Sequence, residues 1–291
     1  MLECLEITKM ASTQQASLGD NTNTESHPRL LVCLLGGFRL LHEGKPLHIS
    51  KKGAALLCVL ARRGGSSVSR EAILADLWPD NDPQLAGRSL NTLLWSLHRR
   101  LAPFLGATQS ILHVNGMYSL NARGGVEADT VSFDTLADAG DAQARRGDWH
   151  KAVELYRRAA ALYRGDLYAG ADMDAEVIIE RERLRARLHS LLADLARSAY
   201  DRSDIDGCLA AAQRVLSSDP FREDMHRLLM RCYVRCGERS QALRQYQVCK
   251  ALLQNEFAVE PEPSTTELFE QIRVDPSYSP SSKAEPKLIN A

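Results

Sequence analysis

Residues 84–101 read QLAGRSLNTLLWSLHRRL, and this stretch decides the fold of the first half of the chain. With about 100° of rotation per helical residue, one narrow stripe collects four leucines: Leu90, Leu94, Leu97 and Leu101. The opposite side collects polar, basic and aromatic side chains: Arg88, Thr92, Trp95 and Arg99, flanked by Asn91 and Ser96. The pattern predicts a helix with one face in a core and one face open to a partner.

The open face of this helix carries the side-chain types that read DNA bases. Arginine donates two hydrogen bonds to guanine, asparagine pairs with adenine, and threonine offers a methyl group to thymine. An ordinary solvated helix face is also polar, but an exposed tryptophan inside a basic face needs a partner, whether nucleic acid, protein or a neighbouring loop. The candidate base-reading residues are therefore Arg88, Asn91, Thr92, Trp95, Ser96 and Arg99.

The segments around this helix predict a winged helix. Short β-type runs are expected at 30–35, 38–41 and 47–49, the last after a turn at 43–46, and helices are expected at 51–63 and from a Ser69 cap to Trp78. Asn115-Gly116 between the runs 111–114 and 117–120 is typical of a hairpin with a type I′ turn. In a winged helix such a hairpin reaches the groove or backbone beside the recognition helix.

The charge of the chain is unevenly distributed. The whole chain has a net charge of −1, but residues 29–125 carry +7, with −3 before them and −5 after them. A basic first domain on an acidic chain is expected when only one part meets a phosphate backbone. The candidates for contacts to the DNA backbone are Lys51, Lys52, Arg70, Arg100, Asn115 and Arg123, the last two at or near the hairpin.

From Val126 onward strand signals vanish and paired helical patterns predominate. The spacing G-x4-A-x3-Y occurs twice, at Gly147-Ala152-Tyr156 and at Gly237-Ala242-Tyr246. It is typical of tetratricopeptide-like repeats, in which glycine permits the turn, alanine the close helix crossing and tyrosine the packing. One such match is expected in any helical bundle, but two in register favour a repeat.

Both halves resemble one known family. GKPLHISKKGAALLCVLARRGGSSVSREAILADLWPD, the GRSLNTLLWSLHRRL helix and HVNGMYSL resemble the OmpR-type winged helix of the Streptomyces antibiotic regulatory protein (SARP) family. GDWHKAVELYRRAAALYRGDL and the closing EFAVEPEPSTTELFEQI resemble its bacterial transcriptional activation domain. The chain departs from the family pattern at Met117 and at His98. The resemblance covers residues 30–273 approximately.

The resulting fold class is an α+β winged-helix domain followed by an all-α tetratricopeptide-like helical-repeat domain. The expected boundaries are a disordered segment at 1–28, the DNA-binding domain at 29–125, the activation domain at 126–274 and a disordered tail at 275–291. The resemblance implies a transcriptional activator that binds promoter direct repeats in double-stranded DNA, as a homodimer or paired protomers, and contacts the RNA polymerase holoenzyme. The alternative is a helical-repeat protein-interaction adaptor without DNA binding; a small-molecule sensor on the repeats is a third hypothesis.

The sequence offers no support for an enzyme. Phosphate-cradling loops, zincin motifs and nucleophile elbows are missing, so we expect no catalytic residues, no metal and no cofactor. The acidic residues from Asp172 to Glu182 alternate with arginines and predict a solvated helix face. Seven cysteines form no CxxC pair; a redox pair at Cys232 and Cys236 is the functional alternative to buried thiols. Without a signal or membrane span, the expected location is the bacterial cytoplasm, on the nucleoid when bound to DNA.

Overall fold

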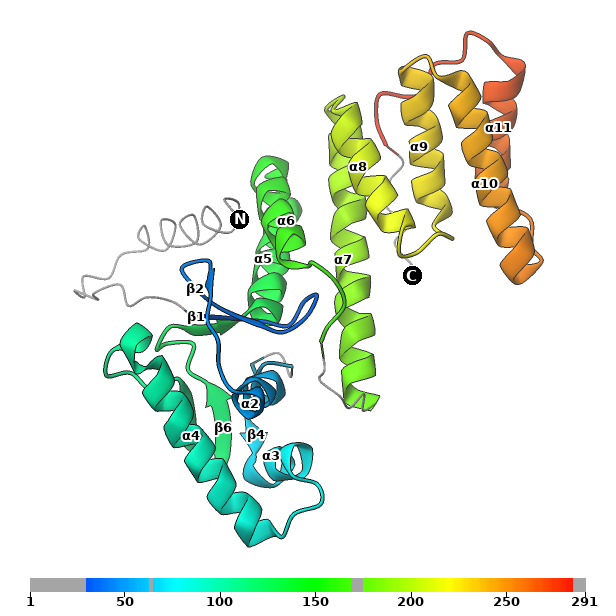
Figure 1. Cartoon of the computed structure of the whole chain (residues 1–291). Helices are drawn as coiled ribbons and strands as arrows, with labels where there is room; N and C mark the ends of the chain where they lie inside the picture. Colours follow the sequence, from blue (N-terminus) through cyan, green and yellow to red (C-terminus); the bar gives the residue numbers. More distant parts are fainter. Residues whose placement is uncertain (1–29, 63–64, 169–174, 285–291) are drawn as a thin grey trace. The chain divides into compact units, whose positions relative to one another are not determined.

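The computed structural model describes residues 30–62, 65–168 and 175–284. The chain forms two compact units (Figure 1). One comprises the residues up to Asp138 together with Ala161–Arg185, and the other comprises Ala139–Ala160 together with the residues from Ala186 onward. The segment 1–28, for which disorder is predicted, lies outside the described residues, as do Asp172 and Asp174 of the acidic run. Within the described ranges, no helix has the length and the hydropathy needed to cross a membrane.

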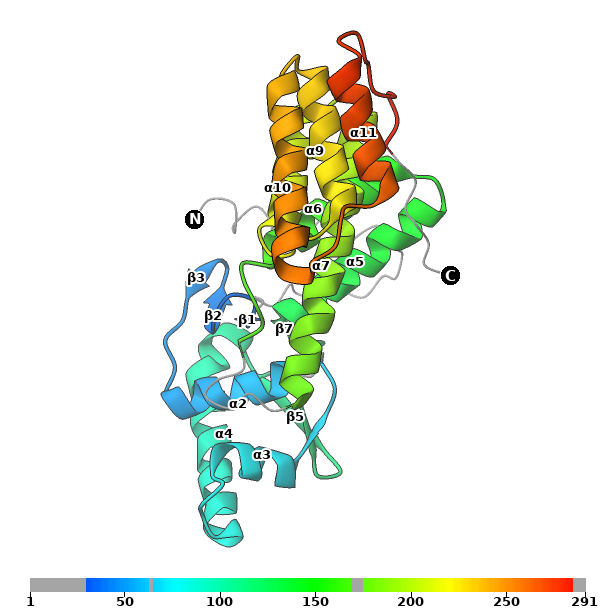
Figure 2. The ribbon, with the colours of Figure 1, turned by 90° about the vertical axis from the view of Figure 1, so that its right-hand side faces the viewer.

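The first unit contains a four-stranded sheet in the order β3-β2-β1-β7 (Figure 2). Its strands are β1 (Leu30–Cys33), β2 (Arg39–His42), β3 (Lys45–Pro46) and β7 (Val126–Ala128). β7 runs parallel to β1, whereas the other pairs are antiparallel. The expectation that strand signals end at Val126 was therefore wrong, because three residues after the hairpin return to pair with the first strand.

The third strand also differs from its prediction. Residues 47–49 form no strand, and β3 lies instead in the predicted turn. The physical reason is a two-residue turn at Glu43 and Gly44, whose φ angles are 49° and 77°. Such a turn closes the hairpin early, so pairing resumes at Lys45 and residues 47–50 lead into the next helix.

The winged-helix elements follow the predicted order. Helices α2 (Lys51–Ala61), α3 (Arg70–Leu77) and α4 (Pro83–Leu105) precede the hairpin β5 (Ile111–Val114) and β6 (Met117–Leu120), which β4 (Val68–Ser69) extends in the order β4-β6-β5. Three side chains cap these helices: Ser50 accepts the Gly53 N–H at 3.1 Å, Ser69 the Ala72 N–H at 3.2 Å, and Asp82 the Gln84 N–H at 2.9 Å. Helix α3 therefore starts at its predicted cap, Ser69.

The core face of α4 confirms three of the four predicted leucines. Leu90, Leu97 and Leu101 are buried, but Leu94 is only half-buried and Leu93 is buried instead. The buried face also includes Ala86, which lies on the Leu93 side of the helix, so the centre of the stripe is rotated away from Leu94.

The remaining helices are α5 (Asp129–Arg145), α6 (Trp149–Leu162), α7 (Ala175–Asp201), α8 (Ile205–Leu216), α9 (Glu223–Arg235), α10 (Arg239–Phe257) and α11 (Pro263–Val274). Gly147 and Gly237 end the turns before α6 and α10 with φ angles of 80° and 77°. In both repeats the predicted alanine is fully buried and the tyrosine nearly so. The two glycine-alanine-tyrosine matches therefore have the packing that the repeat pattern predicts, and α9, α10 and α11 lie side by side (Figures 1 and 2).

The start of the segment predicted to be a disordered tail makes specific contacts. The Tyr200 hydroxyl donates to the Ser281 carbonyl at 2.8 Å, and the Ala284 N–H donates to an Asp201 carboxylate oxygen at 2.6 Å. Tyr278 packs on the cluster around Tyr246. Residues 275–284 therefore run back along the second unit, which differs from the expectation of disorder from residue 275.

A buried carboxylate connects the first sheet to α5. Asp129 is 1% exposed, and its two oxygens accept the N–H groups of Leu34 and Leu35 at 2.8 and 3.0 Å. Burial raises the pKa of Asp129 to about 6, although the accepted N–H groups and the charge of Arg39 favour the ionised form. The carboxylate thus accepts hydrogen bonds from the two backbone N–H groups that directly follow β1.

The segment after α6 pairs with the two residues that follow β1. Leu35 forms a β-bridge with Leu167, and the Tyr168 N–H donates to the Leu34 carbonyl at 2.8 Å. The two backbones approach so closely that a Cβ on Gly36, whose φ is 88°, would lie 2.9 Å from the Arg164 carbonyl carbon. Glycine is required there by both its conformation and the space.

We expect Asp129→Ala to lower the free energy of unfolding by about 2 to 5 kcal/mol, because two buried N–H groups lose their acceptor. Urea denaturation of the full chain measures the change. Asp80→Ala, at an exposed position, is the matched control and should change it by less than about 0.5 kcal/mol. Equal effects of the two substitutions would contradict the role of the Asp129 carboxylate.

The raised pKa of Asp129 also predicts a pH dependence. As the pH falls, Asp129 takes up a proton near pH 6 in the folded state, but only near its ordinary pKa in the unfolded chain. Between these two values the folded state binds more protons, so this group increases the free energy of unfolding as the pH falls from 7 towards 4. Asp129→Asn removes the titration. The difference in unfolding free energy between native protein and variant should therefore shift by about 2 kcal/mol in favour of the native protein over that range, whereas a constant difference would show that Asp129 does not titrate there.

Candidate DNA interface

The six candidate base-reading residues lie on one exposed face of α4, or at its edge: Arg88, Asn91, Thr92, Trp95, Ser96 and Arg99, here called the α4 face. Trp95 is 62% exposed. The Thr92 hydroxyl donates to the Arg88 carbonyl at 3.1 Å. Its hydrogen is therefore used within the helix, so Thr92 can present its methyl group or accept a hydrogen bond from a partner.

The exposed tryptophan has a neighbour on its own helix. The guanidinium carbon of Arg99 lies 5.3 Å from the centre of the Trp95 ring, within the range of a cation–π interaction. This contact partly explains why Trp95, a large aromatic side chain, lies on a basic helix face. It also holds the Arg99 charge beside an open aromatic surface.

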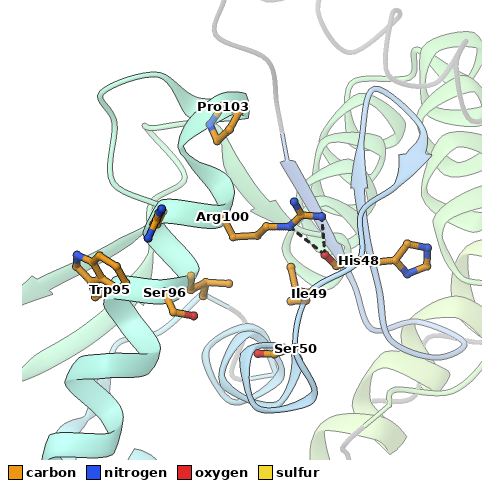
Figure 3. Close-up of a pocket in the computed structure, with 9 residues that line it drawn as sticks. His48, Ile49, Ser50, Trp95, Ser96, Arg100 and Pro103 are labelled. Atoms are coloured by element: carbon orange, nitrogen blue, oxygen red, sulfur yellow. Dashed lines mark hydrogen bonds between the residues drawn. The ribbon is translucent and has the colours of Figure 1, made fainter.

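A hollow of about 600 Å³ lies beside this pair, between α4 and the loop before α2. Figure 3 shows Trp95 and Ser96 projecting from α4 on one side, with Ile49 and Ser50 on the other. Arg100 crosses to the loop, where its Nε and Nη2 atoms both donate to the His48 carbonyl at 3.3 Å (Figure 3). Arg100 thus fixes the loop against α4 and is turned away from the α4 face.

Lys52, another predicted phosphate contact, holds elements of the domain together. Lys52 donates to the Leu77 carbonyl at 2.5 Å, and its ammonium lies 5.1 Å from the centre of the Trp78 ring. Both contacts anchor the end of α3. Lys51, the first residue of α2, is exposed.

Arg70 joins α3, α4 and the hairpin. Its guanidinium donates to the Gly87 carbonyl and to the Tyr118 hydroxyl, both at 3.1 Å, and approaches the Asn91 side-chain oxygen at 3.4 Å. A Cβ on Gly87 would lie 2.9 Å from the Arg70 Nη2 atom, so this position favours glycine. This internal role was not predicted, although Arg70, Gly87 and Tyr118 all fall in the winged-helix motifs of the sequence.

The hairpin has the predicted turn. Asn115 and Gly116 both have positive φ angles, 51° and 76°, which define the type I′ geometry. Asn115 is exposed at the tip, and the Gly116 carbonyl accepts the Arg70 N–H at 3.1 Å. Arg123 is exposed as well, but it lies in the loop after β6, at the end of the hairpin opposite to Asn115.

His98, where the chain departs from the family pattern, connects α4 to the hairpin. Its Nδ1 atom accepts the Ser110 N–H at 3.3 Å and lies 3.0 Å from the Ser110 hydroxyl. Burial lowers the pKa of His98, which favours the neutral ring that can accept. His98 is thus a structural neighbour of the α4 face.

These elements define a class: a winged-helix domain with an exposed basic and aromatic helix, joined to a helical-repeat domain. The profile of the bacterial transcriptional activator domain family matches residues 128–273, half of the chain. The chain therefore belongs to this family, and its SARP-like relatives bear out the resemblance noted in the sequence. The match begins two residues after the predicted start of the second domain.

Two relatives indicate the scope of the likeness. The chain is 27% identical to the regulatory protein AfsR of Streptomyces coelicolor over 96% of its own length, but spans only 28% of that protein. It is 27% identical to the regulatory protein DnrI of Streptomyces peucetius, over 84% of this chain and 93% of DnrI.

A solved structure shares the fold. The Mycobacterium tuberculosis protein EmbR, solved in complex with a low-affinity phosphopeptide, superposes with a TM-score of 0.66 at 20% identity, over 84% of this chain and 65% of EmbR. The likeness extends across the winged-helix and helical regions.

We expect Arg70→Met to lower the free energy of unfolding by about 1 to 3 kcal/mol, because the Gly87 carbonyl and the Tyr118 hydroxyl lose their donor. Tyr118→Phe removes one of these bonds and should cost less. Lys51→Met, at an exposed position of the same domain, is the control. If Arg70→Met and Lys51→Met had equal effects in thermal and urea denaturation, the internal role of Arg70 would be refuted.

Proposed function

We propose that this chain is a sequence-specific DNA-binding transcriptional activator whose α4 face enters the major groove. The observation that carries the proposal is the α4 face itself: a ridge of exposed base-reading side chains, with spacings of four, three and four residues from Arg88 to Arg99, beside a type I′ hairpin. A major groove accommodates one α-helix, and the neighbouring hairpin then meets the backbone or the minor groove.

The side chains of the α4 face have separate roles in this proposal. Arg88 donates to a guanine edge, and Thr92 contacts a thymine methyl group, since its hydroxyl hydrogen is used within α4. Trp95 and Arg99 act together, because the ring positions the guanidinium beside it. Asn91 and Ser96 contact bases or sugars at the edges of the helix.

The backbone contacts divide into direct and indirect ones. Lys51 and Asn115 are exposed at the start of α2 and at the hairpin tip, and we assign them direct phosphate contacts. Arg123 would reach the backbone only from the base of the hairpin. Lys52, Arg70 and Arg100 act chiefly by holding α3, the hairpin and the loop before α2 in place.

The second domain, residues 126–274, is the proposed activation domain. We propose that two protomers occupy direct repeats in a promoter and that this domain contacts the RNA polymerase holoenzyme. In this scheme the protein regulates without catalysis, and it acts on the nucleoid in the bacterial cytoplasm. The name of one relative, regulatory protein DnrI, is consistent with such a role.

Binding to a site selected from random duplex DNA by the full chain tests the proposal. We expect Arg88→Ala and Arg99→Ala each to weaken binding by about 1 to 3 kcal/mol and to relax the preference at one base pair. Arg244→Ala, which removes an exposed arginine from α10, is the matched control and should leave affinity unchanged. Unchanged affinity for both α4 variants in a gel-shift titration would exclude these residues from base recognition.

The salt dependence of the same titration distinguishes the adaptor hypothesis. Phosphate contacts make the logarithm of the binding constant fall linearly with the logarithm of the salt concentration, and Lys51→Ala should reduce that slope by about one. If the random pool yields no enriched site and binding is insensitive to salt, the chain is an adaptor without DNA binding.

A further inference from the structure

Two buried thiols meet between α8 and α9. The Sγ atoms of Cys208 and Cys232 are 3.3 Å apart, and neither residue is exposed. The sequence analysis considered Cys232 together with Cys236, but Cys236 is exposed at the end of α9. The sulfur of Cys232 is therefore in contact with a cysteine 24 residues earlier, on the adjacent helix.

The ends of these helices are held so that the two thiols stay opposed. Arg235 donates to the Tyr200 carbonyl at 3.1 Å and to the Ser203 hydroxyl at 2.7 Å, and its guanidinium lies 4.7 Å from the centre of the Tyr200 ring. These contacts tie the last turn of α9 to the turn between α7 and α8. Cys208 belongs to α8, which follows this turn, and Cys232 belongs to α9.

The two thiols differ in acidity. The hydrogen bond with Cys208, assisted by Arg235, lowers the pKa of Cys232, whereas the same hydrogen bond and burial raise that of Cys208. Because the thiolate is the attacking species, Cys232 is the sulfur of this pair that is better suited to nucleophilic attack.

We infer that Cys208 and Cys232 form a reversible disulfide that links α8 to α9 when the protein meets a hydroperoxide, with Cys236 as the thiol that the oxidant reaches first. The inference goes beyond the proposed function: it describes a modification site in the helical domain and would hold whether or not the chain binds DNA. It rests on the contact of the two sulfurs and on the exposure of the third cysteine one helical turn away.

The chemistry balances in three steps. The hydroperoxide transfers one oxygen to the Cys236 sulfur, giving a sulfenic acid, and its O–O bond is reduced to water or alcohol. The Cys232 thiolate attacks the Cys236 sulfur and expels hydroxide, which takes up a proton to become water. The Cys208 thiol then attacks the Cys232 sulfur, and its proton passes to the Cys236 sulfur, which leaves as a thiol. The net change is loss of one hydrogen from each of Cys208 and Cys232.

The second step requires the end of α9 to open. Side chains four residues apart on a helix have Cβ atoms about 5 to 6 Å apart, farther than a disulfide allows. Cys236 is the C-cap residue, followed by Gly237 with φ 77°, so only the last turn has to change. Terminal turns open at lower free-energy cost than a helix interior, and this opening also releases the Arg235 contacts to Tyr200 and Ser203.

Peptide mapping of the full chain tests the inference, because trypsin separates the three cysteines into Ser203–Arg214, Cys232–Arg235 and Cys236–Arg239. After treatment with hydrogen peroxide and alkylation of remaining thiols, we expect the first two peptides to be cross-linked and the intact mass to fall by two hydrogens. The melting temperature should rise by about 5 to 10 °C and return after dithiothreitol.

Three variants serve as controls. Cys208→Ala should abolish the cross-link to Cys232–Arg235, and Cys236→Ser should give the same link about ten times more slowly, because it removes the accessible thiol. Cys249→Ala, at a buried cysteine of α10, should change neither link nor rate. The inference would be overturned by a final product that is linked through Cys236, or by the absence of a link between Ser203–Arg214 and Cys232–Arg235. It would also be overturned if the link formed equally fast in Cys236→Ser and in the native protein.

Discussion

The structure of the first unit depends on one buried ionic group. Asp129 sits where β7 turns into α5, and its carboxylate accepts the two N–H groups that β1 leaves unpaired at Leu34 and Leu35. Burial of a carboxylate is costly, but an alanine there would leave two orphan donors in the same low-dielectric site. The charge is retained because each oxygen has a donor. The interaction thereby fixes the start of the helical domain to the first strand of the sheet.

The same strand connects to residues still further along the chain. β7 pairs parallel to β1, and residues 164–168 reach the end of β1 through the Leu35–Leu167 bridge and the close approach of Gly36. The sheet is therefore built from residues on both sides of the family boundary near residue 128. A cut at that boundary would remove the Asp129 acceptor and the Leu167 bridge from the end of β1. Hydrogen bonds of the first unit therefore cross the family boundary near residue 128.

Turns and helix caps could be predicted from the sequence, because each depends on only a few neighbouring residues. Asn115-Gly116 predicted a type I′ turn, Ser69 predicted the cap of α3, and the glycines before α6 and α10 have the positive φ of the repeat turn. The strand β7 was missed because three residues carry no periodicity and pair with a partner far away in sequence. The pairing of Cys232 was missed for the same reason: its neighbour, Cys208, is set by helix packing.

The number of phosphate contacts could not be predicted from the net charge of the first domain. The net charge of +7 in residues 29–125 suggested many phosphate contacts. Among the cations that the structure describes, Lys52, Arg62, Arg70 and Arg100 donate hydrogen bonds to acceptors inside the domain. Arg62, for example, is 5% exposed and pairs with Asp76 at 2.5 Å. Because a guanidinium held by internal acceptors has fewer donors to offer a phosphate, the charge that contacts DNA is smaller than the charge that steers it. In the proposed function, the specificity of binding then rests on the α4 face, whose arginines are exposed.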